Sequence, residues 1–137
     1  MLPAPALIIF HKQKTSGRLR FLCLPTGVLC FGGVPEGSSL KASGEGDLGI
    51  HPTHWLQAAE GQLHLTAGSL EPEAEFLQWL DTPFGNIPVL LAGLTCIDPP
   101  FEAAEALEGK FITIMDSRRL TALEQKLLGL AYEHVLG

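Results

Sequence analysis

The sequence predicts a single α+β domain in which an antiparallel N-terminal meander continues into a mixed sheet and an amphipathic helix ends the chain. Three observations lead to this prediction. The 137 residues are 46% apolar and 18% charged, which is typical of a compact domain around one core. Short strand-like runs separated by turn residues fill the N-terminal part. A capping motif and leucines at helical spacing characterise the C-terminal part.

Two strands and a turn open the chain. Residues Ala6–His11 and Arg18–Leu24 are rich in Ile, Phe and Leu, and Thr15-Ser16-Gly17 can turn the chain between them. Pro25-Thr26-Gly27 provides a second turn, because proline presets an early turn position and glycine accepts a positive φ after it. Val28–Phe31 then predicts a third strand, which completes the meander.

Residues 32–49 are rich in glycine and serine and predict a mobile connection within residues 1–137, since neither side can close a core alone. Gly44–Gly49 matches G-x-G-x-x-G, the fingerprint of dinucleotide-binding loops. We reject this interpretation because no strand precedes the motif, and because Glu45 and Asp47 would repel phosphate.

The middle of the chain combines a short helix with strands. Pro52–Ala59 predicts the helix, and the alternating run Gln62–Thr66 predicts a strand. Residues 71–81 allow two interpretations. Glu71-Pro72-Glu73 is typical of a helix start, whereas the turn residues of Asp81–Asn86 favour a hairpin with strands near 75–81 and 86–96. We prefer the hairpin.

A βαβ-like unit is expected next. Asp98 can cap a helix over residues 99–108, because Pro99 and Pro100 suit its first turn and Gly109 can end it. Phe111–Met115 then predicts a strand that runs parallel to the strand before Asp98.

The chain ends in a clearly marked helix over residues 121–136. Thr121 and Glu124 form a capping box, in which the threonine hydroxyl and the glutamate satisfy the first free N–H groups of the helix. Leu120, Leu123 and Leu127 then begin an apolar stripe at helical spacing.

Charge restricts the class of partner. The net charge of −6 and the pI of about 5.2 argue against nucleic acid, which needs clustered Lys and Arg. The first 41 residues carry five basic and one acidic side chain, whereas residues 42–137 carry four basic and fourteen acidic ones. The basic side chains gather between Lys12 and Arg20. They predict a solvated turn or a contact with an acidic partner, such as the acidic part of another copy.

Three cysteines and one long apolar stretch bear on the compartment. Cys23, Cys30 and Cys96 lie in apolar runs without the spacing of a disulfide framework, so we expect free thiols in a reducing cytoplasm. The stretch from Ile87 to Ile97 is too short to span a bilayer, which argues against a membrane protein.

Two aspartates form the first candidate catalytic site. Asp98 and Asp116 each follow a predicted strand, and parallel neighbouring strands would bring both carboxylates to one edge of the sheet. Such a pair can position Mg²⁺ or share a proton. Ser117, Arg118 and Arg119 lie beside Asp116 and could bind the anionic part of a substrate. The structural alternative is that Asp98 caps a helix and Asp116 begins a turn.

Cys96 and three histidines complete the candidates. Cys96 lies close to an expected helix N-terminus, which can lower the pKa of a nucleophilic thiol. His51, His54 and His64 could hold a divalent metal, with Glu60 as a further ligand or base. Their spacing matches no named zinc motif, so ordinary surface positions are the alternative, and we expect no cofactor.

The sequence contains no catalytic motif that we can identify. We therefore expect a cytoplasmic protein that acts by association, as a homodimer or as a small subunit bound to another protein. The alternative is a small enzyme or ligand-binding protein, with its site at the carboxyl edge of the sheet (Asp98, Asp116, Arg118) or at the three histidines.

Overall fold

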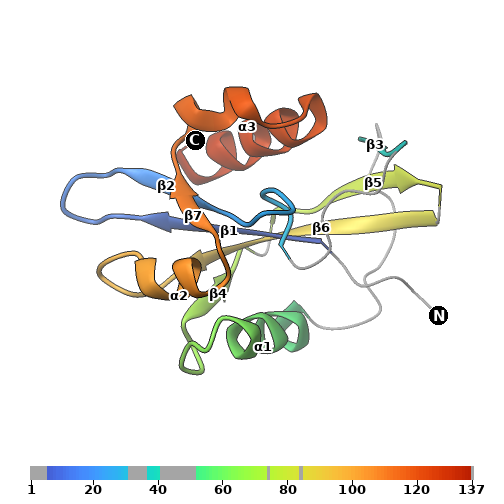
Figure 1. Ribbon diagram of the computed structural model, residues 1–137. Coiled ribbons are helices and arrows are strands. Elements are labelled where there is room, and N and C mark those ends of the chain that lie inside the picture. The colour runs from blue at the N-terminus through green and yellow to red at the C-terminus, as the bar shows by residue number, and fades with distance from the viewer. Residues whose placement is uncertain (1–5, 31–36, 41–51, 74, 84, 137) are drawn as a thin grey trace.

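The computed structural model describes residues 6–30, 37–40, 52–73, 75–83 and 85–136, with the backbone alone for residues 52–54. The elements are β1 (Ala6–Lys12), β2 (Leu19–Cys23), β3 (Ser39–Leu40), α1 (Pro52–Gln62), β4 (Leu70–Pro72), β5 (Gln78–Thr82), β6 (Gly85–Leu94), α2 (Phe101–Ala106), β7 (Lys110–Ile112), the 3₁₀ helix η1 (Ile114–Arg119) and α3 (Ala122–Leu136). Helices lie on both sides of one mixed sheet (Figure 1), so the predicted α+β class, mixed sheet and terminal helix are confirmed.

The sheet is built around the parallel pair of β1 and β6. Its strand order is β3-β5-β6-β1-β2-β7, and β4 also pairs with β6, at the end that β5 does not reach. Ala6 lies opposite Val89, and Phe10 opposite Gly93. β2 is antiparallel to β1, and β7 is antiparallel to β2. β7 therefore runs in the direction of β6 but lies on the far side of two other strands.

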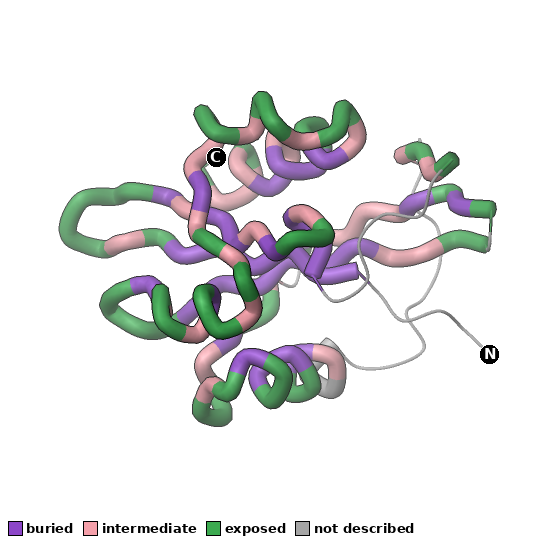
Figure 2. Tube along the Cα trace, viewed as in Figure 1, coloured by how far each residue is buried: buried purple, intermediate pink, exposed green. Residues whose placement is uncertain are grey.

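Both faces of β1 are buried, because successive side chains of a strand point to opposite faces and each face has a helical cover. Ile8 and Phe10 belong to the cluster that packs against α3, whereas Leu7 and Ile9 belong to the cluster that packs against α1 and α2. Figure 2 shows the buried residues along the central strands and on the helix sides that face them. Full burial of one such side chain contributes about 1.5–3 kcal/mol, so this strand is the centre of the core.

Two glycines are required by close packing around these strands. A Cβ on Gly93 would lie 2.7 Å from the ring of Phe10, and a Cβ on Gly109 would lie 2.9 Å from the carbonyl oxygen of Cys23. Gly109 follows α2 as expected, but the left-handed residue at this helix end is Glu108, with a φ of 60°. Glycine is therefore needed at position 109 because a side chain would not fit there, and not because the backbone is left-handed.

Two buried glutamates connect the helical layers to the sheet. Glu124 in α3 is 6% exposed, and its Oε2 accepts a hydrogen bond of 2.9 Å from the N–H of Val28. Glu60 in α1 is 5% exposed, and its Oε2 accepts a hydrogen bond of 3.0 Å from the N–H of Leu70. Such bonds to an ionised carboxylate are stronger than bonds between neutral groups. Each one ties a helix to a segment that leaves or enters the sheet.

The predicted cap of α3 by Thr121 is present, but Glu124 binds the Thr121 hydroxyl and not its backbone N–H, so half of the predicted capping box is formed. The N–H of Glu124 donates to Thr121 Oγ1 at 3.2 Å, and the Thr121 hydroxyl donates to Glu124 Oε1 at 3.0 Å. Gly27 makes room for the carboxylate, because a Cβ there would collide with Glu124 Oε2, and its φ is +116°. The turn Pro25-Thr26-Gly27 is therefore required by a contact across the fold.

The predicted third strand of the meander is wrong for its described part, Val28–Cys30. Leu24 and Gly27 close a tight turn with reciprocal backbone hydrogen bonds, and Cys30 then forms an isolated bridge with Leu7. The N–H of Val28 is bound by Glu124 and does not join a strand ladder. Phe31 lies outside the described residues.

The predicted strand Gln62–Thr66 is also wrong, although the preceding helix is confirmed. α1 extends to Gln62, and the N–H of Leu63 still donates to the carbonyl of Ala59 at 3.0 Å. His64 then adopts a positive φ of 56° in a turn. Leu63 is buried in the same apolar cluster as Leu56 and Ala59 of α1, so the alternation of apolar residues reflects a helix end.

The hairpin interpretation of residues 71–81 is correct, because β5 and β6 pair in antiparallel fashion next to each other in the chain. Two short strands are missing from the sequence prediction, β4 and β3. β3 lies within the glycine-rich stretch and pairs with β5. The rest of that stretch, residues 32–36 and 41–49 with the G-x-G-x-x-G motif, lies outside the described residues.

The expected cap of α2 is wrong. Asp98 lies before the helix, whose N-cap is Pro100 without a side-chain hydrogen bond. A residue that precedes proline is held extended, so the pair Pro99-Pro100 delays the helix to Phe101.

No helix in the described part of the chain is long and apolar enough to cross a membrane.

We predict that Glu124→Ala lowers the free energy of unfolding by about 2–3 kcal/mol, because it leaves the Val28 N–H without its partner and removes the carboxylate that binds the Thr121 hydroxyl. Chemical denaturation measures this change. Glu133→Ala on the exposed side of α3 is the matched control and should change stability by less than about 0.5 kcal/mol. Equal effects of the two substitutions would contradict a structural role for Glu124.

Candidate functional site

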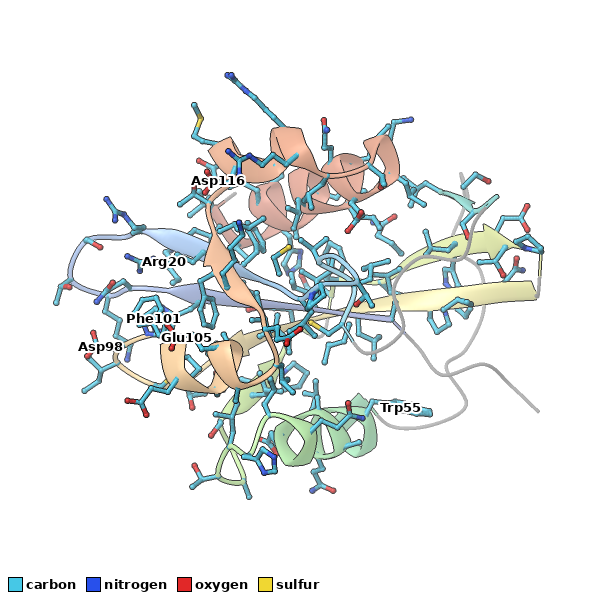
Figure 3. The ribbon with its side chains drawn as sticks, viewed as in Figure 1. Arg20, Trp55, Asp98, Phe101, Glu105 and Asp116 are labelled. Carbon is cyan, nitrogen blue, oxygen red and sulfur yellow. The ribbon has the colours of Figure 1, made fainter. Side chains whose placement is uncertain are left out.

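The two candidate aspartates do not form one site. β6 and β7, which precede them, are separated by β1 and β2, so the expectation of neighbouring parallel strands is wrong. Three strand spacings correspond to roughly 14 Å. Figure 3 shows Asp98 near α2 and Asp116 near η1 and α3, on opposite sides of the sheet. The described structure therefore holds two separate surfaces, one around each aspartate.

The surface around Asp98 joins the β1–β2 loop to the start of α2. Asp98 Oδ1 accepts a hydrogen bond of 3.1 Å from the side-chain amide of Gln13, and the carbonyl of that amide accepts a hydrogen bond of 2.9 Å from Arg20. The guanidinium of Arg20 lies 5.9 Å from the ring centre of Phe101, which in turn packs edge-to-face against Phe111. Figure 3 shows Arg20, Asp98, Phe101 and Glu105 at this end of the sheet.

A buried histidine anchors the segment that leads to this surface. His11, at the end of β1, is fully buried, and its Nε2 lies 2.9 Å from the carbonyl oxygen of Cys96. With Nε2 as the donor, this bond holds the chain between β6 and α2 against β1. Among the described residues, His11 Nδ1 and Trp79 Nε1 are the buried side-chain atoms without a hydrogen-bond partner.

The three cysteines are free, and each has a raised thiol pKa. Burial raises the pKa of Cys96; a backbone hydrogen bond lowers it in part, and Asp98 adds a smaller increase. Burial, with a smaller contribution from Cys23, raises the pKa of Cys30 to about 12. Burial and then Glu124 raise the pKa of Cys23, although Lys110 opposes them. Cys96 is exposed but lacks the lowered pKa that activates a nucleophile.

The surface around Asp116 begins with a second capping box. Asp116 Oδ2 accepts hydrogen bonds from the N–H of Thr113 at 3.0 Å and from its hydroxyl at 3.2 Å, and these bonds start η1. They are the main reason why the pKa of Asp116 lies below its ordinary value, with smaller contributions from Lys110 and Arg119. The Ser117 hydroxyl donates to the carbonyl of Ile114 at 2.7 Å. Asp116 and Ser117 therefore shape η1.

A small cleft of about 160 Å³ lies between β2, β7 and η1. Lys110, Asp116 and Arg119 line it together with Cys23 and apolar residues. Arg118, the neighbour of Arg119, is exposed outside this cleft. Of the predicted anion-binding residues, Arg119 is thus the one that shares a cleft with Asp116, and Lys110 was missed.

The histidines are not brought together among the described residues. His51 lies outside them, the side chain of His54 is not described, and His64 is exposed in the turn after α1. Glu60, the expected further ligand, binds the N–H of Leu70. Within the described part of the chain, no three His, Cys, Asp or Glu side chains are grouped closely enough to hold a metal ion.

A shallow groove of about 640 Å³ lies between the end of α1 and α2. Its lining is mostly apolar and includes Leu63, Pro99 and Phe101, with Glu102 and His64 as its polar members. The groove therefore extends the surface around Asp98 toward α1.

Comparison with known proteins adds no function to this geometry. The chain matches no protein-family model, and no curated protein has a significantly similar sequence.

Sequence reasoning missed three residues of these surfaces. Gln13 carries no charge or motif, and Lys110 precedes the predicted strand Phe111–Met115 without belonging to any motif. His11 lies in an apolar run whose strand character was recognised, and a polar residue at a position of a fully buried strand was the available signal. The hydrogen-bond partners of His11 and Gln13 lie 85 residues away in the sequence. Local sequence patterns do not reveal contacts over such a separation.

The capping box of η1 predicts a pH dependence. A carboxylate whose pKa is lower in the folded state stabilises the fold above its unfolded pKa, and this contribution is lost as the pH falls through the folded pKa. The stability difference between the wild type and Asp116→Asn should therefore shrink as the pH falls below about 4. Thermal unfolding at several pH values measures it. A difference that is constant from neutral to acidic pH would show that the carboxylate charge plays no part.

The three cysteine thiols should react with an alkylating reagent in the order of their exposure to solvent. Iodoacetamide at mildly alkaline pH should label Cys96 first and Cys23 more slowly. Cys30 should stay unlabelled until the protein unfolds, because it is buried and its pKa is raised to about 12. Mass spectrometry of peptides after timed labelling measures the order. Labelling of Cys30 as fast as Cys96 in the folded protein would contradict the described packing.

Proposed function

We propose that this protein acts by association with a second copy of itself, through the surface formed by residues 12–20 and 97–108. These residues comprise the β1–β2 loop with its flanking strand ends, the segment before α2, α2 itself and the turn after it. We call them the association surface. The charge distribution on this surface is the observation that carries the proposal.

The association surface contains two segments of equal and opposite charge. Residues 12–20 carry four basic and no acidic side chains, namely Lys12, Lys14, Arg18 and Arg20. Residues 97–108 carry four acidic and no basic side chains, namely Asp98, Glu102, Glu105 and Glu108. The Gln13–Asp98 hydrogen bond shows that the two segments are neighbours in one molecule. A two-fold axis between them would place the basic segment of each copy against the acidic segment of the other.

The charges of the two segments are available for such a contact. In the described part of the chain, Glu73 and His134 form the one ion pair within 4.0 Å, away from this surface. Lys12, Lys14 and Arg18 are exposed, as are all four acidic residues. Pairing between copies would therefore replace solvent contacts and not existing salt bridges. Complementary charge mainly sets the orientation and the rate of association.

Exposed apolar side chains support an interface at the same place. Ile97 is 82% exposed and Phe101 is 49% exposed, although both are large apolar residues. Burial of a side chain of this size contributes about 1.5–3 kcal/mol. Apolar residues with charged residues around them are the common arrangement in protein interfaces. Three free thiols support a reducing compartment such as the cytoplasm for this association.

A ligand-binding function is the second candidate, and one observation favours it. Lys110 and Arg119 meet at the cleft near Asp116, so an anion could be held there. An enzyme that uses Asp98, Asp116 and Arg118 together would need a rearrangement, since the first two side chains lie on separate surfaces.

Charge reversal tests the association directly. Sedimentation velocity at micromolar concentration should show dimers of the wild type, and the dimer should weaken at high salt because exposed charge pairs are screened. Lys14→Glu/Arg18→Glu and Glu102→Lys/Glu105→Lys should each give monomers, since like charges then meet across the axis. An equimolar mixture of the two variants should form a heterodimer, because both contacts are again complementary.

Glu133→Lys, on α3 and away from the association surface, is the matched control and should leave the dimer intact. A wild-type protein that sediments as a monomer at micromolar concentration would refute the proposal. Dimers that persist in both charge-reversed variants would refute this surface.

A further inference from the structure

The cleft between β2, β7 and η1 is lined by two positively charged residues in a part of the chain that is otherwise acidic. Residues 42–137 contain four basic side chains among fourteen acidic ones, and all four lie between Lys110 and Lys126. Two of them, Lys110 and Arg119, line the cleft. In an acidic chain, this concentration of cations attracts anions to one place.

The two cations of the cleft make no hydrogen bond and no close ion pair with other described residues, although both act on Asp116 at longer range. Among the described residues, the side chains of Lys110 and Arg119 form no hydrogen bond, and neither has a carboxylate within 4.0 Å. Asp116 lines the same cleft, but its Oδ2 accepts both hydrogen bonds from Thr113. The cleft therefore carries two positive charges and one negative charge, and Asp116 Oδ2 is already bound in the capping box of η1.

The other residues that line the cleft favour a small anionic ligand. Cys23 and Lys110 are paired residues of β2 and β7. The Cys23 thiol stays neutral at physiological pH, because burial raises its pKa. Ile112 of β7 and Leu120, the residue after η1, form apolar parts of the wall. The volume of about 160 Å³ is below that of common sites for drug-sized ligands, roughly 300–1,000 Å³.

We propose that this cleft binds a small oxyanion of the phosphate type between the ammonium of Lys110 and the guanidinium of Arg119. A guanidinium can donate two parallel hydrogen bonds to such a group, while an ammonium acts as a point charge. The group is either free phosphate or the phosphate of a larger monoester whose remainder lies outside the cleft. This site is distinct from the association surface, because none of the residues that line the cleft belongs to residues 12–20 or 97–108.

Titration of ¹⁵N-labelled protein with inorganic phosphate, at constant ionic strength, tests the site by NMR. Saturable shifts of the amides of Lys110, Thr113 and Arg119 are expected, with a dissociation constant on the order of 1 mM. Lys110→Gln and Arg119→Gln should each weaken binding about tenfold, the loss expected for one charged hydrogen bond. Arg118→Gln is the matched control, since its side chain is exposed outside the cleft, and it should leave binding unchanged.

Phenyl phosphate in a parallel titration distinguishes the two sources. Saturation at the same amides assigns the site to phosphomonoesters, whereas binding of inorganic phosphate alone assigns it to the free ion. Shifts that grow linearly without saturation, or losses that are equal for Arg118→Gln and Arg119→Gln, would overturn the proposal. Thermal unfolding of each variant verifies that the substitutions leave the fold intact, as expected for exposed side chains.

Discussion

The parallel pair of β1 and β6 is apolar on both faces, and its need for a cover on each side determines where every helix lies. Ile8 and Ile9, adjacent residues of β1, are fully buried on opposite faces. A sheet with one solvent-exposed face could not bury both side chains. α3 covers one face, and α1 with α2 covers the other (Figure 1). The long connections between strands exist because each must carry the chain to the required side.

Helical covers need fixed attachment as well as apolar contact, because apolar packing has no direction of its own. Glu124 and Glu60 supply that direction from α3 and α1, each through a hydrogen bond to a backbone N–H outside its helix. Truncating either side chain would leave a donor without its partner, which costs more than the bond contributes when made. On the α3 side, His134 Nε2 lies within hydrogen-bond distance, 3.3 Å, of Glu73 Oε2 in the segment between β4 and β5. Polar side chains inside this fold thus position elements that the core alone would leave free to shift.

Glu60 and Glu124, the buried carboxylates, are engaged in the fold, and the molecule carries its available chemistry on two surfaces. One presents opposite charges side by side around Phe101, and the other presents Lys110 and Arg119 at a cleft. The sequence revealed the basic segment near Lys12 and the candidates Asp98, Asp116 and Arg119, but it placed the two aspartates together. Their separation follows from strand order, because a crossover that passes over two strands has no local signature in the chain.

Local patterns by themselves determined the α+β class, the first two strands, the β5–β6 hairpin, α1 and the cap of α3 by Thr121. Each of these depends on residues a few positions apart, where periodicity and turn chemistry act directly. Tertiary structure alone decided which N–H groups enter the sheet. The Val28 N–H is bound by Glu124 from 96 residues away and does not join a strand. Leu63 follows α1 and is buried with Leu56 and Ala59 in one apolar cluster. Strand order and the grouping of side chains into sites were decided in the same way, since they minimise the free energy of the whole chain and not of any segment.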